Sequence, residues 1–366
     1  MKESIVATML FADLMSSTEM AKNLTLQEYD EMIVDFQSTM YEVVSHHLSH
    51  YDYVGDGLDC SWSIAGDELR VFLYSGAVRF DVRNALLIAM KIKLAWLAAA
   101  FNERILQEGR LVSRIGVGIN CGKVIKDVRE WRVRMGQEQP NIEGYAINVS
   151  KRVESASRET NVYQIMVGDS LYKRCQGSNE INVTFGQPRS LVFKGLGQKI
   201  PVYEVVSFVN FETLPSMPAS MQDGLLEKMQ YAVTQPNPEP WIFVTLLRHY
   251  ISLITSGGHE YLESHGIKLA EQALEVMEHK TVIYNMLGWL YAYGQSVRNL
   301  EMAVHSFDQS LSLEPRNEPA LLHKARILGI MGKTDLSQHA YEEILFYNKD
   351  HAEARRKVGE HQAGQQ

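Results

Sequence analysis

The sequence predicts an α+β domain followed by an all-α domain. Up to about residue 210, short β-rich runs such as RIGVGIN, YQIMV and VYEVVSFV lie among longer helical patterns. Between about 212 and 241 the chain is rich in proline, which interrupts regular structure, and beyond it strand signals nearly vanish. We therefore expect an α+β domain at 1–210, a linker at 211–241 and a helical domain at 242–366.

Composition narrows the function classes. With 366 residues, 45% of them hydrophobic, the chain can bury two cores. Its formal net charge of -8 gives no overall attraction to nucleic acid or to an anionic membrane, so we expect neither as a partner. Cys60, Cys121 and Cys175 are too widely spaced for a disulfide framework or a zinc site. This cysteine usage predicts a protein of the reducing cytoplasm.

Two long helices are predicted in the first domain. Thr25 and Glu28 form a capping box, and apolar residues follow at helical spacing as far as HHLSH, near residue 50. A second long helix is expected over 79–107. Its most apolar stretch, ALLIAMKIKLAWLAAAF, carries Lys91 and Lys93 in the middle, which favours a buried amphipathic helix over a membrane span.

Helical hairpins are predicted in the second domain. YNMLGWLYAYG precedes AVHSFDQSLSLEP, and ALLHKARILGIMG precedes HAYEEILFYNKD. Phe307 and Leu311 recur 34 residues later as Tyr341 and Leu345, which resembles the tetratricopeptide repeat, although the loop within the first pair is longer. A helical bundle with a common core is the alternative. In either case we expect a module that senses a trigger ligand or binds a partner protein.

Two acidic residues follow apolar runs in the first domain. The segment FADLMSST, which contains Asp13, follows the apolar run IVATML, and in IAGDELRVFLY a Gly-Asp turn places Asp67 before a strand. Carboxylates at two strand ends are the ligands that a divalent cation on a nucleoside triphosphate requires. The stretch after Asp13 is equally compatible with a simple strand-to-helix turn capped by Ser or Thr.

Polar residues suited to nucleotide chemistry come later in the chain. In NIEGYAINVSKR, Asn148 and Arg152 are four apart at the start of a helix, so they share one face. An amide can orient a ribose, and a guanidinium can neutralise charge on a phosphoryl oxygen. In FKGLGQKIPVYEV, Lys194 lies in a Gly-flanked turn before a strand, where its ammonium could meet a terminal phosphate.

The order of these segments resembles the catalytic domain of the class III nucleotidyl cyclases, from about residue 4 to 206. FADLMSST looks like that family's first metal motif, GDEL like its second, INVSKR like its Asn-x-x-x-Arg motif, and FKGLG like its triphosphate lysine segment. The resemblance implies a ferredoxin-like cyclase domain and a homodimer with composite active sites. One subunit would supply Asp13 and Asp67, and the other would supply Asn148 and Arg152.

The resemblance also implies ligands for Mn²⁺ or Mg²⁺ and for the triphosphate. The metals would be held by Asp13, Leu14 and Asp67. The amides from Leu14 to Thr18 would wrap phosphate oxygens, which makes Ser16, Ser17 and Thr18 nucleotide-binding residues. Asp56 in VGDGLD rivals Asp67, because its distance from Asp13 is nearer to the family's common spacing. We favour Asp67 because a clean strand and then a helix follow it.

The expected substrate is a pyrimidine nucleotide. Adenylate cyclases of this class read the purine with a lysine and an acidic residue, and at those positions this chain has Ser63 and Asn141. Asn141 can both donate to and accept from the edge of uracil, or flip to suit cytosine. Such replacements resemble the bacterial pyrimidine cyclases of antiphage defence, which make cyclic UMP or cyclic CMP as an infection signal. We expect UTP over CTP; an adenylate cyclase, or a degenerate scaffold that recruits partners through its helices, remains as an alternative.

Overall fold

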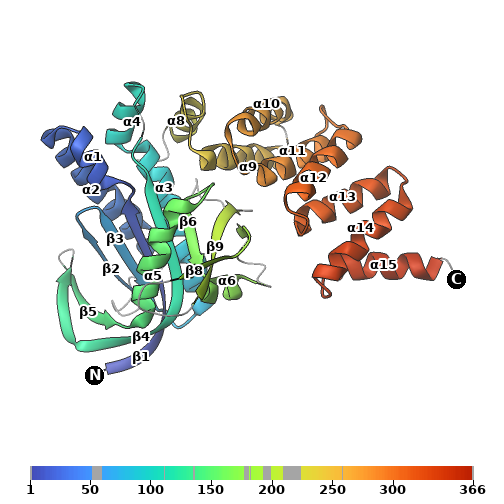
Figure 1. Cartoon of the computed structure of the whole chain (residues 1–366). Helices are drawn as coiled ribbons and strands as arrows, with labels where there is room; N and C mark the ends of the chain where they lie inside the picture. The colour runs from blue at the N-terminus through green and yellow to red at the C-terminus, as the bar shows by residue number, and fades with distance from the viewer. Residues whose placement is uncertain are drawn as a thin grey trace. The chain divides into compact units, whose positions relative to one another are not determined.

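The protein forms two compact units, Met1–Pro238 and Glu239–Gln366. The computed structural model describes residues 2–51, 60–110, 112–134, 137–176, 181, 183–192, 199–208, 224–257 and 259–364, without the side chains of 128–139 and 361–364. The first unit combines a mixed sheet with helices, and the described part of the second is helical (Figure 1). The predicted fold class, an α+β domain followed by packed helices, is confirmed.

The sheet of the first unit is built around its first strand. Its strand order is β2-β3-β1-β4-β6-β9-β7, with β5 paired to β4 and β8 paired to β9. Strand β1 is antiparallel to both β3 and β4, whereas β4 and β6 are parallel. The strands are β1 Lys2–Leu14, β2 Cys60–Ala65, β3 Glu68–Leu73, β4 Ile115–Arg134, β5 Gln137–Glu143, β6 Ile165–Gly168, β7 Val183–Phe185, β8 Arg189–Val192 and β9 Lys199–Phe208.

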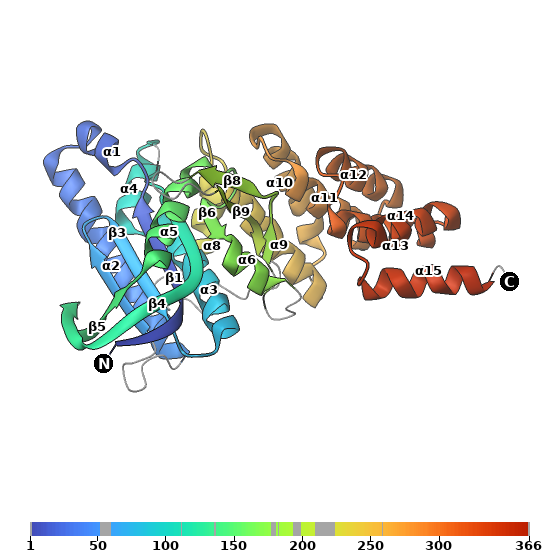
Figure 2. The same ribbon diagram turned by 60° about the horizontal axis from the view of Figure 1, so that its bottom comes forward.

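Helices cover both faces of this sheet. Helix α5 lies on one face, and α2 and α3 lie on the other (Figures 1 and 2). The capping box that begins α2 is confirmed, because Thr25 Oγ1 accepts from the Glu28 amide at 3.2 Å and Glu28 Oε2 accepts from the Thr25 amide at 2.8 Å. The helices of this unit are α1 Ser17–Asn23, α2 Leu26–His50, α3 Val78–Ala98, α4 Ala100–Gln107, α5 Tyr145–Ala156, the 3-10 helix η1 Ser157–Glu159, α6 Asp169–Cys175 and α8 Leu225–Ala232.

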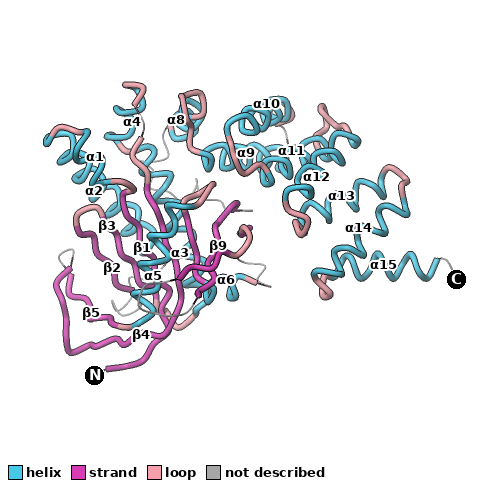
Figure 3. The backbone as a smooth tube through the Cα atoms, viewed as in Figure 1, coloured by secondary structure: helices cyan, strands magenta, loops and turns pink. Residues whose placement is uncertain are grey.

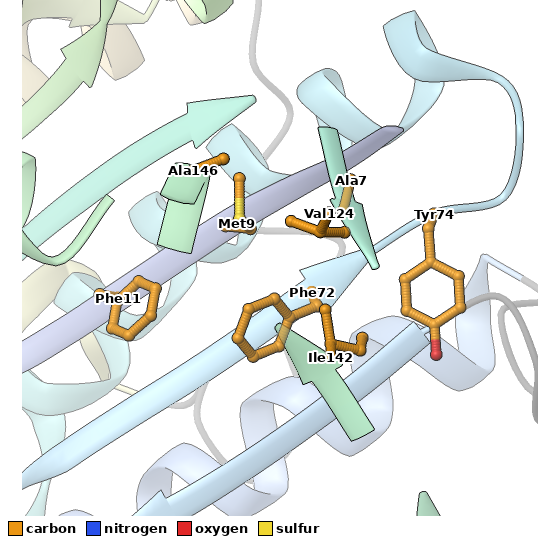
Figure 4. Close-up of a cluster of buried hydrophobic side chains, with 8 residues drawn as sticks. All are labelled: Ala7, Met9, Phe11, Phe72, Tyr74, Val124, Ile142 and Ala146. Carbon is orange, nitrogen blue, oxygen red and sulfur yellow. The ribbon is translucent and has the colours of Figure 1, made fainter. Parts of the chain in front are cut away.

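An apolar cluster holds α5 and the β4–β5 hairpin against the centre of the sheet (Figure 4). On β1 its members alternate, as expected for one face of a strand, and they pack against side chains from β3, β4, β5 and α5. The buried members are Ala7, Met9, Phe11, Phe72, Tyr74, Val124, Ile142 and Ala146. Asp13 continues this β1 alternation beyond Phe11, so it lies on the α5 face.

The helix expected over 79–107 is two helices, α3 and α4, bent by 50° at Ala99. Ala99 is extended, and the carbonyl of Trp96 accepts hydrogen bonds from the Ala99 amide at 3.3 Å and from Asn102 Nδ2 at 2.8 Å. Helix α3 is buried along most of its length, including both of its lysines. Among the described residues no single helix is long and apolar enough to span a membrane, although α3 and α4 together pass that test of length and composition.

The expected linker contains regular structure, so the prediction of an irregular segment over 211–241 is wrong in two places. Residues 224–232 begin with a turn and form α8, whose Lys228 bonds to Glu103 Oε2 at 2.8 Å within the first unit. Pro240 occupies the first turn of the next helix, where the missing N–H costs no hydrogen bond. Residues 209–223 lie outside the described part of the chain. Cys60, Cys121 and Cys175 all lie within the described residues and form no disulfide there.

The second unit is a succession of helices in which each packs on its neighbours along the chain (Figure 3). They are α9 Pro240–Ser256, α10 Tyr261–Val276, α11 Thr281–Tyr293, α12 Leu300–Leu313, α13 Glu318–Ile330, α14 Thr334–Tyr347 and α15 Ala352–Gly364. Helices α11 to α14 confirm the four predicted helical segments. Phe307 and Tyr341 are both buried in hydrophobic clusters. Assignment to the tetratricopeptide class stays a prediction.

The longer loop of the first hairpin is held by a buried carboxylate. Glu263 of α10 is fully buried and accepts from the amides of Gln295 and Ser296 at 2.8 Å and of Val297 at 3.2 Å. The Ser296 hydroxyl donates to the same carboxylate at 2.6 Å. This anchor explains how the helical hairpin accommodates a loop that departs from the repeat spacing.

Candidate active site

Strand β1 ends beside the turn that joins β2 to β3. Asp13 is paired with Glu68 across the β1–β3 ladder. The turn consists of Gly66 and Asp67, and Gly66 has a φ of 61°, which glycine adopts without strain. The Leu14 amide donates to the carbonyl of Asp67 at 3.2 Å. The structure therefore brings the two predicted metal carboxylates, Asp13 and Asp67, together within one chain.

The charges of this corner perturb one another. Burial raises the pKa of Asp13 to about 6, and the Asp67 and Glu68 carboxylates also raise it, while Arg158 and Lys151 lower it. A divalent cation would relieve this repulsion, and carboxylate oxygens are the ligands that Mg²⁺ and Mn²⁺ prefer. The described residues hold no group of three or more His, Cys, Asp or Glu placed to bind a metal. The two carboxylates suit a cation that a triphosphate also ligates.

Cations from the same chain already contact these carboxylates. Arg158 Nη2 donates to Asp13 Oδ2 at 3.0 Å. Glu68 accepts from Lys151 Nζ at 2.6 Å and from Arg70 Nε at 2.5 Å. None of these four pairing residues was predicted from the sequence. Lys151 and Arg158 belong to one predicted helical stretch, which is a signal that they lie near each other. That stretch contains no information on their partners Glu68 and Asp13, which are far away in the chain.

The glycine-rich strand RIGVGINCG has a packing role. A Cβ on Gly118 would lie 2.0 Å from the Glu154 amide nitrogen, and one on Gly116 would lie 2.4 Å from Ser157 Oγ. These glycines therefore let the backbone of α5 approach β4 closely. Gly116 is also the β4 partner of Asp13, so the close approach brings the C-terminal end of α5 to the acidic corner.

Glu154 is a further acidic residue at this corner, and it was not predicted from the sequence. It is 3% exposed, and its Oε1 has no hydrogen-bond partner among the described residues. Burial raises the pKa of Glu154 to about 7, and the charge of Asp13 raises it as well. The side chain lies 3.5 Å from the position of a Cβ on Gly116. With this pKa, the Glu154 carboxyl group is about half protonated near neutral pH, and it lies beside the candidate metal ligands.

Asn148 and Arg152 lie on α5, as predicted. Asn148 is exposed and Arg152 is half-buried. The arrangement in which a partner subunit supplies them stays a prediction.

The predicted phosphate cradle is partly occupied by the fold itself. The Leu14 amide is bonded to Asp67, and the Met15 amide donates to the Arg114 carbonyl at 2.8 Å. In this structure the fold itself therefore engages the Leu14 and Met15 amides, and phosphate binding by the amides from Leu14 to Thr18 stays a prediction. Ser16 has a left-handed φ of 58° and makes no side-chain cap, although α1 begins directly after it. The amides of Ser16, Ser17 and Thr18, and Leu14 as a metal ligand, remain predictions.

The two predicted base-reading residues do not meet within one chain. Ser63 is paired with Arg70, whose partner on β1 is Phe11, so Ser63 is on the α5 face. Asn141 is paired with Asp127, whose partner on β1 is Lys2. Lys2 alternates with the Phe11 set along β1, so Asn141 is on the face opposite to α5. Asn141 is buried and donates one amide hydrogen to Glu143 Oε1 at 2.8 Å. Lys194 and Asp56 lie outside the described residues.

Comparison with known proteins finds similarity in solved structures alone. No protein-family model matches the sequence, and no curated protein matches it. The guanylyl cyclase Cya2 is similar with 18% identity and a TM-score of 0.45, over 57% of this chain and 96% of that chain. The adenylyl cyclase CyaB from P. aeruginosa is similar with 16% identity and a TM-score of 0.45, over 57% of this chain and 98% of that one. A bacterial light-regulated adenylyl cyclase is similar with 16% identity and a TM-score of 0.41, over 62% of this chain and 59% of that chain. Similarities of this size do not assign an activity to this chain.

Proposed function

We propose that this protein is a metal-dependent nucleotidyl cyclase that converts a nucleoside triphosphate, preferably UTP, to its 3′,5′-cyclic monophosphate and pyrophosphate. The observation that carries the proposal is the meeting of Asp13 and Asp67, which are 54 residues apart in the sequence, at the end of β1 and the adjoining hairpin turn. Their carboxylates, with the phosphate oxygens, complete the oxygen-rich set that a divalent cation takes.

The reaction needs a nucleophile, a neutralised phosphate and a leaving group. The ribose 3′-oxygen attacks the α-phosphorus, the bond from that phosphorus to the bridging oxygen breaks, pyrophosphate leaves, and the hydroxyl proton passes to water. A bound Mg²⁺ or Mn²⁺ supplies acidity to the 3′-hydroxyl and neutralises phosphate charge.

The chain's own residues have separate roles in this proposal. Asp13 and Asp67 hold the cation, and the amides of Ser16, Ser17 and Thr18 hold phosphate oxygens. Asn148 orients the ribose, and Arg152 stabilises the charge that grows on the α-phosphoryl group. Lys194 binds the terminal phosphate.

A homodimer is part of the proposal. Lys151 and Arg158 contact the acidic corner of their own chain. The resemblance to the class III cyclases implies that Asn148 and Arg152 serve the corner of a second copy. The pyrimidine preference, the infection-signalling role and the sensing role of the second unit rest on the resemblance drawn from Ser63, Asn141 and the helical pattern.

The deciding experiment is a competition among the four nucleoside triphosphates. The full chain is incubated with equal ATP, GTP, CTP and UTP and with Mn²⁺, and the products are identified by mass spectrometry. We expect cyclic UMP as the main product. A dominant cyclic AMP product would overturn the pyrimidine preference and leave the cyclase class intact. If neither Mn²⁺ nor Mg²⁺ supported any cyclic product, the scaffold alternative would replace the proposal.

Point variants test the assigned residues in the same reaction. Asp67→Ala and Arg152→Ala should each abolish product, because one removes a metal ligand and the other removes a charge needed in the transition state. Arg104→Gln is a control, since Arg104 is a half-buried arginine paired with Glu31, away from the assigned residues. Turnover that persists in Arg152→Ala would reject the role given to that arginine.

A further inference from the structure

Arg158 is paired with Asp13, a candidate metal ligand, and the backbone of Arg158 is held in place by hydrogen bonds around it. Its guanidinium lies 3.0 Å from Asp13 Oδ2, and its side chain is 46% exposed. The backbone around it is fixed, because Arg189 donates to the Glu159 carbonyl at 2.6 Å and the Thr160 hydroxyl donates to the Ser157 carbonyl at 2.7 Å. The side chain can therefore leave Asp13 without any change in the packing of η1.

The two ladder carboxylates differ in their supply of cations. Glu68 is contacted by both Arg70 and Lys151, so it keeps a partner if one of them moves away. Arg158 is the cation within ion-pair distance of Asp13 among the described residues. A divalent cation bound by Asp13 would take the place of the guanidinium and repel it, because both need the same oxygen and both are positive.

A displaced guanidinium at this position has an obvious second ligand. The phosphate oxygens of a metal-bound triphosphate would lie next to Asp13, and arginine binds phosphate through two parallel hydrogen bonds. A rotation of the Arg158 side chain, without movement of its backbone, is enough to exchange the Asp13 carboxylate for a phosphate oxygen.

We propose that Arg158 is a cation placeholder at the metal site: it pairs with Asp13 in the metal-free protein, is displaced by the divalent cation, and then binds a triphosphate oxygen. This inference rests on the proposed function for the identity of the ligands. It assigns Arg158 two opposite effects, since it weakens metal binding in the absence of nucleotide and strengthens binding of the triphosphate once the metal is present.

The test measures these two affinities separately in the full chain. The affinity for Mn²⁺ without nucleotide is read from the free-ion signal in electron paramagnetic resonance. Affinity for tripolyphosphate and for UTP at saturating Mn²⁺ is read by calorimetry. For Arg158→Gln we expect Mn²⁺ binding roughly 2- to 5-fold tighter, the range for loss of one partly exposed ion pair. We expect triphosphate binding weaker by about tenfold or more, since a charged hydrogen bond is lost.

The controls separate this exchange from a structural role. Arg158→Lys keeps the charge and should bind Mn²⁺ close to the wild-type affinity. Arg104→Gln removes a comparable exposed ion pair elsewhere and should change neither affinity. A merely structural arginine would weaken both affinities when substituted, as would a variant that folds poorly.

The outcomes also separate this inference from the proposed function. Unchanged or weaker Mn²⁺ binding in Arg158→Gln would overturn the placeholder, whatever the activity of the wild type. Tighter Mn²⁺ binding with unchanged affinity for tripolyphosphate and UTP would overturn the second half of the exchange. A wild type that makes no cyclic product would overturn the proposed function, while the comparison of Mn²⁺ affinities would still decide the role of Arg158.

Discussion

Gly118 lies directly beneath the backbone of Glu154, so close that a Cβ on the glycine would stand 2.0 Å from the Glu154 amide nitrogen and 2.3 Å from its Cα. Strand β4 and helix α5 meet here with no side chain between them. The contact sets the height of α5 above the sheet. It thereby places Glu154 and Arg158 beside the acidic end of β1.

Gly118→Ala should therefore force α5 away from the sheet. The atoms in the way belong to backbone, which cannot rotate aside, so we expect the free energy of unfolding to fall by at least about 3 kcal/mol. Urea unfolding followed by circular dichroism measures this change. Gly186→Ala is the control, because the nearest atom to its added methyl is 3.5 Å away, an ordinary contact. Equal stability of the two variants would contradict the close approach.

Glu154→Gln should change the pH dependence of stability. The pKa of Glu154 is raised from 4.5 to about 7 in the folded protein, so the folded state binds the proton more tightly than the unfolded state between these values. Wild-type stability should therefore fall as pH rises through this window, whereas glutamine has no proton to lose. The free energy of unfolding of the variant relative to that of the wild type should therefore increase between pH 4.5 and 7, by up to about 3 kcal/mol.

Metal-free urea unfolding at a series of pH values gives the difference between the two proteins. Glu159→Gln removes an exposed glutamate nearby and controls for the loss of one negative charge. A difference that stays constant from pH 4.5 to 7 would show that Glu154 does not titrate as described.

Local signals in the sequence predicted local structure well. The capping box at Thr25, the Gly-Asp turn at Asp67 and the helical segments of the second unit are each encoded within a few neighbouring residues. The break at Ala99 could not be predicted in this way, because alanine is the best helix former and the break depends on Asn102 reaching back to Trp96.

The contacts of the candidate site were harder to predict, because they join residues far apart in the chain. The apolar runs beside Asp13 and Asp67 predicted both carboxylates as metal ligands, and that role stays a prediction. Nothing near Arg158 in the sequence indicates a partner 145 residues away. The glycines of β4 are visible as a pattern, but their role becomes clear once Glu154 is seen against Gly118.

Lys91→Met should reveal a buried amine in the core of the first unit. Lys91 Nζ lies 3.0 Å from His47 Nδ1, whose other ring nitrogen bonds to Asn84 Oδ1 at 3.0 Å. The Asn84 amide group donates to the Phe80 carbonyl, so its oxygen faces the ring and His47 carries its proton on Nε2. Burial lowers the pKa of His47 to about 2, so the ring is neutral and does not repel the amine.

Burial also lowers the pKa of Lys91, from 10.5 to about 8. Between these values the unfolded state binds more protons, so wild-type stability should rise with pH from about 8 to 10.5. Methionine does not titrate, so the stability of the variant relative to the wild type should be greatest below pH 8 and should decrease by up to about 3 kcal/mol toward pH 10.5. Lys173→Met, which removes an exposed lysine, controls for the loss of one positive charge. Parallel stability curves for Lys91→Met and the wild type would refute the buried amine.

Glu263→Gln should loosen the first hairpin of the second unit. Burial alone would raise the pKa of Glu263, but hydrogen bonds from Ser296, Gln295 and Val297 outweigh it and the pKa is lowered. A neutral amide can accept through one oxygen only, so we expect the loop to lose about 2 kcal/mol of local stability at pH values above the usual pKa of a glutamate. This loss should shrink as pH falls and the wild-type carboxylate is protonated. Glu271→Gln, an exposed change on the same helix, is the control. Hydrogen exchange of the 295–297 amides measures the effect, and unchanged protection would contradict the anchor.

Two inactive variants should restore activity when mixed, if the active site is composite. In a mixed dimer of Asp67→Ala and Arg152→Ala, one site carries both substitutions and the other carries neither. Random pairing puts half of the chains in mixed dimers with one intact site in two, so activity should recover to about a quarter of the wild type. Asp67→Ala mixed with Asp13→Ala is the control and should remain inactive, because both substitutions affect the same half of each site. Because the proposed dimer takes Asp67 from one subunit and Arg152 from the other, we expect recovery in the first mixture alone. Absence of recovery in a mixture shown by native mass spectrometry to contain mixed dimers would reject a site shared between subunits.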